Sequence, residues 1–379
     1  MKTEKYIYKT IIENKKKENI RLNIIKNYLI FYKDKKKYIT KPDNDINKKI
    51  INKKYNIIKM NKCSKNIILS NNNLIKIENL KEIKVFNKIN KDISNDLKNF
   101  FIDCIYSNLS INYIINNISS KNKIFIKIPK NIIIKKDIHI VNINNKKNTE
   151  YKQLYIIAEE NSKIKIKNYY INNNDTSSNN ININIYLKKN STLSYKIINS
   201  NKKKTIHNNS VYSKQLENSI LNITELSIKN DNIKSQKFFF LLGKNSQLKK
   251  KAAYILNTGM KCDIQCKINH YENESKSTTI VKTTNKNSNI IFKANIEVAK
   301  GIEKTQSHLK CNGLMLSKKG SIEFIPELSI NNNNVICSHA ATIGYIDKNV
   351  IKYMQSRGIK ENDCINKLIK IFFNEILND

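Results

Sequence analysis

The stretch that decides the fold is Ile181-Asn182-Ile183-Asn184-Ile185, in which apolar and polar residues strictly alternate. Alternation with a period of two places the isoleucines on one face of a β-strand and the asparagines on the other. Ile164-Lys165-Ile166 repeats this pattern upstream, and residues Ile124 to Pro129 open the series of short isoleucine-rich runs. The pattern predicts a succession of half-buried strands from about residue 121 onward.

Small polar turns separate these runs and recur regularly. They lie 27 to 29 residues apart, at Asn161-Ser162, Asn190-Ser191, Asn218-Ser219, Asn245-Ser246 and Asn273. Weaker turn signals fall roughly midway, at Asp175, Asp231, Gly259 and Asn287. A strand-and-turn unit of about 14 residues, doubled to about 28, fits one coil of a flattened, two-walled parallel β-helix. Inward positions of neighbouring coils then stack, while outward Lys and Asn stay in water.

A coil has no core of its own, so both ends of such a β-helix need capping. Asp347 is expected to cap a helix through Ser356, with Gly358 as its stop. A second helix, about Asn362 to Leu377, carries an apolar stripe. We therefore divide the chain into a mostly helical N-terminal region (1–120), a β-helix core (121–345) and a C-terminal helical region (346–379).

The formal charge of +38 suggests a nucleic-acid binder, but the composition favours another origin. Of 69 basic residues only Arg21 and Arg357 are arginine, and lysine is spread from end to end. Phosphate-binding sites usually retain clustered Arg for bidentate contacts. Residues with AT-rich codons dominate the chain, so drift in a strongly AT-biased bacterial genome, such as that of a reduced endosymbiont, explains the lysines. Nucleic-acid binding stays as a less favoured alternative.

Other functional classes find little support. The 31 acidic residues are scattered, without the carboxylate cluster that a polysaccharide-active β-helix enzyme needs. No Gly-rich loop ends in Gly-Lys-Ser/Thr, so no nucleotide site is expected. Seven cysteines form no regular framework, Met1 to Lys17 has no apolar signal core, and no run of about 18 apolar residues occurs. We expect a reduced, cytoplasmic protein without a membrane span.

The residues that resist the compositional bias gather near the C-terminal end. All seven glycines lie between Gly243 and Gly358, and six of the seven alanines share this part of the chain. Glycine and alanine are kept where the backbone conformation or the packing leaves no room for Lys, Asn or Ile. Function is therefore expected in the C-terminal third.

That third resembles the SufB/SufD family of iron–sulfur cluster assembly proteins. The likeness covers about residues 265–377 and rests on Asn312, Leu314, Leu316, Ser317, Pro326-Glu327-Leu328, Ile330, Val335, Cys337-Ser338-His339, Ala341-Thr342, Gly344, Tyr353 and Ser356-Arg357-Gly358-Ile359. Cys337-Ser338-His339 with Ala341-Thr342 resembles the SufD branch, because SufB proteins typically carry Glu-His-Glu-Ala-Thr there. Ala340 departs from the glycine usual in that branch. A SufB-like homodimeric scaffold is the nearest alternative.

The resemblance implies a right-handed parallel β-helix with helical ends and a non-catalytic subunit of a larger complex. Its implied partners are a SufB-like paralogue, a SufC-like ATPase on the C-terminal helices, and a cysteine desulfurase or other sulfur donor acting through the complex. A transient iron–sulfur cluster would form at the SufB–SufD interface. Reduced flavin has been proposed for the family, but no motif supports it here.

Cys337 and His339 are the candidate metal ligands. Positions i and i+2 of a strand face the same side, so thiolate and imidazole can reach one metal. Iron–sulfur clusters usually take four protein ligands, so a site shared with a partner fits better than a closed one. A buried thiol beside a hydrogen-bonded histidine is the alternative. We predict partner-binding residues on the C-terminal helices at Tyr353, Arg357, Gly358, Ile359, Phe372 and Phe373.

Overall fold

The structure is a computed structural model, and it describes residues 65–377 with gaps at 71–72, 79, 81, 88–92, 98, 101–112, 114–115, 118, 121–122, 145–148, 173–177, 201–204 and 229–230. The chain divides into two compact units, Met1–Cys63 with Lys98–Leu109, and Ser64–Leu97 with Ser110–Asp379. All the strands and helices named below belong to the second unit. The helical pattern predicted before residue 65 and the turn predicted at Asp175 lie outside the described residues.

The described strands form two sheets. Sheet A holds ten strands, in the order β19 (Val335–Tyr345), β17 (Thr305–Met315), β15 (Lys276–Asn285), β13 (Gln247–Leu256), β11 (Ile220–Ile228), β9 (Thr192–Ser200), β7 (Lys163–Asn172), β5 (Ile138–Asn144), β1 (Lys65–Ser70) and β2 (Asn73–Glu78). Sheet B holds nine, in the order β18 (Ser321–Ile330), β16 (Asn289–Val298), β14 (Lys261–His270), β12 (Asp231–Leu241), β10 (Thr205–Gln215), β8 (Ser178–Leu187), β6 (Glu150–Ala158), β4 (Lys123–Ile128) and β3 (Lys84–Phe86).

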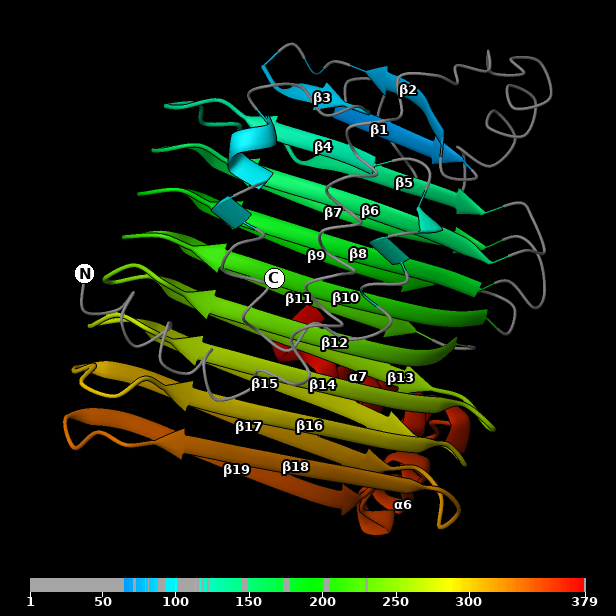
Figure 1. Cartoon of the computed structure of the whole chain (residues 1–379). Coiled ribbons are helices and arrows are strands. Elements are labelled where there is room, and N and C mark those ends of the chain that lie inside the picture. Colours follow the sequence, from blue (N-terminus) through cyan, green and yellow to red (C-terminus); the bar gives the residue numbers. More distant parts are fainter. Residues whose placement is uncertain are drawn as a thin grey trace. The chain divides into compact units, whose positions relative to one another are not determined.

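From β4 onward, consecutive strands alternate between the two sheets, and each pairs in parallel with the strand one coil away. Figure 1 shows this stack, coloured from the blue β1 to the orange β19. The architecture is the parallel β-helix that the period-two runs predict. β1, β2 and β3 precede residue 121, so the sheets begin earlier in the chain than the sequence pattern indicates.

Asparagine closes the coils. Asn131, Asn161, Asn190, Asn218 and Asn245 all have positive φ, between 54° and 62°. This left-handed conformation suits glycine, and asparagine is among the few other residues that adopt it readily. The side chains form a ladder, in which Asn218 Nδ2 donates to Asn190 Oδ1 at 3.1 Å and Asn245 Nδ2 to Asn218 Oδ1 at 3.0 Å. Asparagine thus fills turn positions that glycine would otherwise occupy.

The serine after each of three of these asparagines turns inward and is buried. Ser162, Ser191 and Ser219 donate their hydroxyls to the carbonyl three residues back, at 2.6 to 2.7 Å. The repeated Asn-Ser pairs therefore mark coil corners, as predicted. At the next corner the left-handed residue is Glu274, directly after Asn273. Of the weaker signals, Gly259 and Asn287 lie in left-handed turns, whereas Asp231 begins strand β12.

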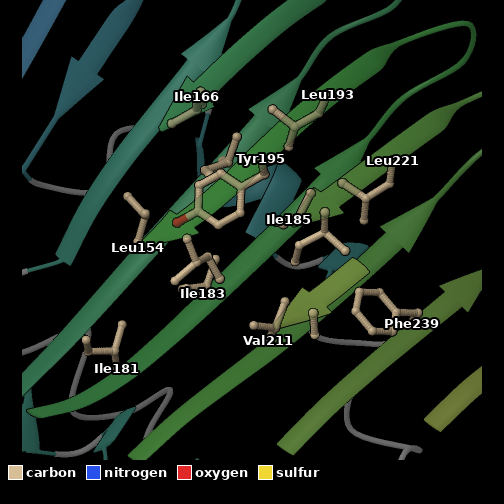
Figure 2. Packing of buried hydrophobic residues seen from close by; sticks show 14 of the residues in the cluster. Leu154, Ile166, Ile181, Ile183, Ile185, Leu193, Tyr195, Val211, Leu221 and Phe239 are labelled. Atoms are coloured by element: carbon tan, nitrogen blue, oxygen red, sulfur yellow. The ribbon is translucent and has the colours of Figure 1, made fainter. Parts of the chain in front are cut away.

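The core lies between the two sheets and consists of stacked inward positions. Figure 2 shows aliphatic and aromatic side chains from neighbouring coils packed against one another there. Leu154, Ile183 and Val211, for example, occupy successive rungs of one column, and each is at most 5% exposed. Polar residues interrupt this core between strands β11 and β12. Glu225 and Lys237 form an ion pair at 2.6 Å with side chains only 2% and 1% exposed.

Two helices end the described chain. Helix α6 (Lys348–Ser356) begins after Asp347, which caps it by accepting a hydrogen bond from the Asn349 N–H at 2.8 Å. Gly358 follows with φ of +81°, so the predicted helix start and stop are both observed. Helix α7 (Glu361–Leu377) lies against β13 and β15, and its Phe373 and Ile376 pack on Leu226 and Ala253 of sheet A. No described helix is long and apolar enough to cross a membrane.

Candidate functional site

The last coil leaves two strand edges open. β18 and β19 are the end strands of their sheets, and within the described part of the chain each pairs on one edge only, with β16 and β17. Apolar side chains are exposed along β19, where Ile336, Ile343 and Tyr345 are 61%, 49% and 65% accessible. An unpaired edge with exposed apolar groups is a template for association with another chain.

The structure brings Cys337 and His339 to this open end. In the parallel register, Cys337 lies beside Ser307 and His339 beside Leu309. Ser307 and Leu309 are buried inward residues of β17, so Cys337 and His339 continue inward columns with no further coil of the described chain beyond them. The two side chains therefore share the inner side of the last strand, as their i, i+2 spacing predicts.

The Cys337 thiol is half-buried. Burial raises its pKa, and a hydrogen bond from the backbone N–H of Ser307 partly opposes that rise. The resting side chain is accordingly a protonated thiol at neutral pH. Thiolate ligands form when metal binding displaces the proton, so the raised pKa does not exclude a ligand role.

Ser338 points to the other face of the strand. His308 Nδ1 lies 2.8 Å from Ser338 Oγ on the outer side of sheet A. The two residues are 30 apart in the sequence, which equals one coil in this part of the chain, so the coil spacing is the signal that pairs them. The Cys-Ser-His element is therefore split, with two side chains facing inward and one outward.

No group of three or more His, Cys, Asp or Glu side chains suited to a metal occurs among the described residues. Within that part of the chain, Cys337 and His339 lack the further donors of a closed site. Cys262, Cys266 and Cys311 are buried in the β-helix, and burial raises the pKa of each thiol. Cys364 is also buried, and its thiol donates to the Ile359 carbonyl at 3.5 Å.

The predicted partner-binding residues differ in exposure. Tyr353 is 62% exposed, and the Arg357 guanidinium lies 5.5 Å from the centre of its ring. Ile359 and Phe372 are half-buried, and Gly358 is exposed. Phe373, in contrast, is fully buried against sheet A. In this structure it holds α7 on its own sheet and presents no surface to a second chain.

Fold and site together define a β-helical protein with an open, thiol- and imidazole-bearing end and a pair of helices beside it. The family described as "SUF system FeS cluster assembly, SufBD core domain" matches residues 141–372, more than half of the chain. The chain therefore belongs to the SufBD family, which acts in iron–sulfur cluster assembly.

Individual relatives agree. The chain is 31% identical over 137 residues to the iron–sulfur cluster assembly protein SufD of Escherichia coli. This matched stretch covers 36% of this chain and 32% of the relative. It is 37% identical over 98 residues to an iron–sulfur cluster assembly SufBD family protein of Archaeoglobus fulgidus, 26% of each chain. The matched stretches thus span about a third or less of these curated relatives.

Proposed function

We propose that this chain is the SufD-like subunit of a SUF iron–sulfur cluster assembly complex and pairs through its last coil with a SufB-like paralogue. The observation that carries the proposal is the open end itself. Within the described part of the chain, this one coil combines two unpaired strand edges, exposed isoleucines and the inward-facing Cys337 and His339. A second β-helix that docks there would continue both sheets and cover the two side chains.

The choice of SufD over SufB rests on sequence. Cys337-Ser338-His339 followed by Ala341-Thr342 resembles the SufD branch, and one similar relative is the SufD protein of Escherichia coli. The scarcity of arginine and glycine supports an origin in a strongly AT-biased genome such as that of a reduced endosymbiont. A homodimeric SufB-like scaffold would instead associate with a second copy of this chain.

The cluster is the cargo of this complex. Cys337 supplies a sulfur and His339 a nitrogen, which are two of the four ligands that a cluster usually takes. The remaining ligands belong to the paralogue in this proposal, so the cluster forms only at the joint between subunits. Sulfur arrives from a cysteine desulfurase through the complex, and any reduced flavin would have to bind without a motif in this chain.

The C-terminal helices are the proposed seat of a SufC-like ATPase in the cytoplasm. Tyr353, Arg357, Gly358, Ile359 and Phe372 form the accessible part of the predicted docking surface. Helix α7 is anchored to sheet A, because Lys282 Nζ donates to the Phe372 carbonyl at 2.9 Å and pairs with Glu375 at 2.8 Å. Movement of a docked ATPase would pass to the sheet that ends in β19. The chain itself is proposed to be non-catalytic.

The test is an affinity purification of the tagged full chain under anaerobic conditions, with SufB-like and SufC-like proteins co-expressed. We expect both partners in the eluate. Ile343→Asp on the open edge loses the paralogue and keeps the ATPase, whereas Tyr353→Asp on α6 does the reverse. Ile206→Asp is the matched control, since Ile206 is 47% exposed on β10, away from either surface. Retention of both partners by both interface variants would refute the assignment.

A further inference from the structure

A second buried lysine lies in the core, one strand after the ion pair of Glu225 and Lys237. Lys250, on β13, is only 2% exposed, and among the described residues its Nζ has no hydrogen-bond partner. Buried polar groups are hydrogen-bonded in folded proteins and buried charges are paired, because their removal from water is costly. The Lys250 side chain therefore requires a partner that the described side chains do not supply.

The carboxylate of Glu225 does not neutralise this lysine. The electrostatic neighbours of Lys250 are Glu225, Lys237 and two thiols. Glu225 is already paired with Lys237 at 2.6 Å and accepts a hydrogen bond from Tyr254 at 2.8 Å. Two lysines thus share one carboxylate in this part of the described core, which leaves one positive charge in excess when Lys250 is protonated.

The polar groups around the Lys250 side chain can all donate hydrogen bonds. Thr279 occupies the next rung of the same inward column, is 1% exposed, and has an Oγ1 that also lacks a partner in the described part of the chain. Cys266 and Cys311 are the two thiols, and burial raises the pKa of each, so both are protonated at neutral pH. An anion is the class of ligand that an ammonium, a hydroxyl and thiols can all contact by donating.

Small side chains accompany this lysine. Lys250 extends from sheet A toward sheet B, where its Nζ lies 5.3 Å from the centre of the Phe292 ring. Ala252, 0% exposed, follows it on the same face of β13, and Ala294, 3% exposed, is the rung beside Cys266 in sheet B.

In earlier coils the columns of these two alanines hold larger residues, Ile197 and Val211. The exchange of large for small side chains provides the volume for the lysine and for a small guest beside its amine.

We propose that Lys250 and Thr279 form a buried binding site for one small inorganic anion of the size of chloride. The anion balances the excess positive charge and accepts hydrogen bonds from the ammonium and hydroxyl groups. A buried water molecule would satisfy the hydrogen bonds but leave the charge unbalanced. Burial lowers the pKa of Lys250, and an opposite charge beside the amine counteracts that fall.

The first test measures urea unfolding of the full chain at constant ionic strength while sodium gluconate, whose anion is too large for the core, is replaced by sodium chloride. One anion bound only to the folded state lowers the unfolding equilibrium constant about ten-fold for each ten-fold rise in chloride above its dissociation constant. Lys250→Met removes this dependence, and it is expected to fold because it removes the buried charge together with its need for a partner. Thr279→Val keeps the dependence but shifts it to about ten-fold higher chloride, since a hydrogen bond to a charged group is lost.

Lys249→Met is the matched control, because Lys249 is exposed on the opposite face of the same strand. It should show the chloride dependence of the native chain. An equal dependence in the native chain and in Lys250→Met would overturn the proposal, since chloride would then act through the many surface lysines. A native chain whose stability is the same in chloride and in gluconate would overturn it as well.

The second test locates the anion directly in crystals of the full chain purified and grown in sodium bromide. The anomalous signal of bromide is expected beside Lys250 Nζ in the native chain and in Lys249→Met, and to be missing from Lys250→Met. A native crystal with a water molecule or nothing at that point would overturn the proposal. No partner protein is involved and the site is distinct from Cys337 and His339, so these outcomes are independent of the proposed function.

Discussion

The ion pair between Glu225 and Lys237 offers the sharpest test of how the β-helix interior is held together. Lys237 Nζ lies 2.6 Å from Glu225 Oε2, and Tyr254 OH donates to the same carboxylate at 2.8 Å. Burial alone would raise the pKa of Glu225, but Lys237, Lys250 and Tyr254 outweigh it and hold the pKa below its ordinary value. The carboxylate is therefore ionised and is the main counter-charge of a buried ammonium group.

Among the described residues, Glu225→Leu leaves Lys237 with only the oxygens of Ser235 at 2.8 Å and Tyr254 at 3.3 Å as hydrogen-bond partners. Breaking a buried ion pair in this way costs about 3–5 kcal/mol of unfolding free energy. Replacing both partners, as Glu225→Leu with Lys237→Met, removes the uncompensated charge, so the double variant is expected within about 1 kcal/mol of the native chain or above it. The single and double changes are then strongly non-additive.

Guanidinium unfolding followed by circular dichroism measures these free energies. Glu217→Gln is the control, because Glu217 pairs with Lys189 at 2.8 Å on an exposed turn and no measurable change is expected there. A double variant as unstable as the sum of its singles would refute the reasoning. It would mean that the two side chains stabilise the core by packing rather than as a pair of charges.

Two further predictions concern the turns and the buried imidazole. Asn218 has a left-handed backbone with φ of +54°, which alanine adopts less readily than asparagine or glycine. Thermal unfolding of Asn218→Ala is therefore expected to show a loss of about 1–2 kcal/mol of unfolding free energy, and Asn218→Gly a smaller loss. Equal losses for the two variants would contradict a conformational origin. His270 has a folded pKa of about 4 against an ordinary 6.5, so its contribution to stability is complete above pH 6.5 and declines as the pH falls toward 4. Between pH 6.5 and 5 the unfolding free energy is expected to fall by about 2 kcal/mol because of this group, and His270→Gln should remove that part of the pH dependence. An unchanged dependence of the unfolding free energy on pH would show that the imidazole is protonated in the folded chain over this range.

Much of the fold can be predicted from local sequence. Strict alternation in Ile181 to Ile185 identifies strands, and the spacing of the Asn-Ser pairs sets the length of one coil. Both signals are local, because a strand has a period of two and a left-handed corner tolerates few residues other than Gly and Asn. β1 reads Lys-Asn-Ile-Ile-Leu-Ser, with three apolar residues in a row and no alternation, and β3 is only three residues long, so neither shows a period of two.

The site was predictable only in part. The spacing of Cys337 and His339 places them on the same side of a strand, but which side depends on register with β17. The same register decides the contact of His308 with Ser338. The contact of His270 with Ser277 instead joins β14 of sheet B to β15 of sheet A, and neither contact follows from a single sequence motif. Phe372 and Phe373 show the limit clearly. Both belong to the apolar stripe of α7, yet only packing on sheet A reveals that Phe373 is buried there.

The most direct test of the proposed function is cluster formation on the reconstituted complex of this chain with a SufB-like paralogue and a SufC-like ATPase. Iron and acid-labile sulfide per complex are measured anaerobically for the native chain and for His339→Ala, with His308→Ala as the control on the outer face of the same sheet. The account predicts that His339→Ala assembles normally with its partners but accumulates much less cluster, while His308→Ala behaves as the native chain. Undiminished cluster on the His339→Ala complex would contradict the assignment of the open coil as the assembly site.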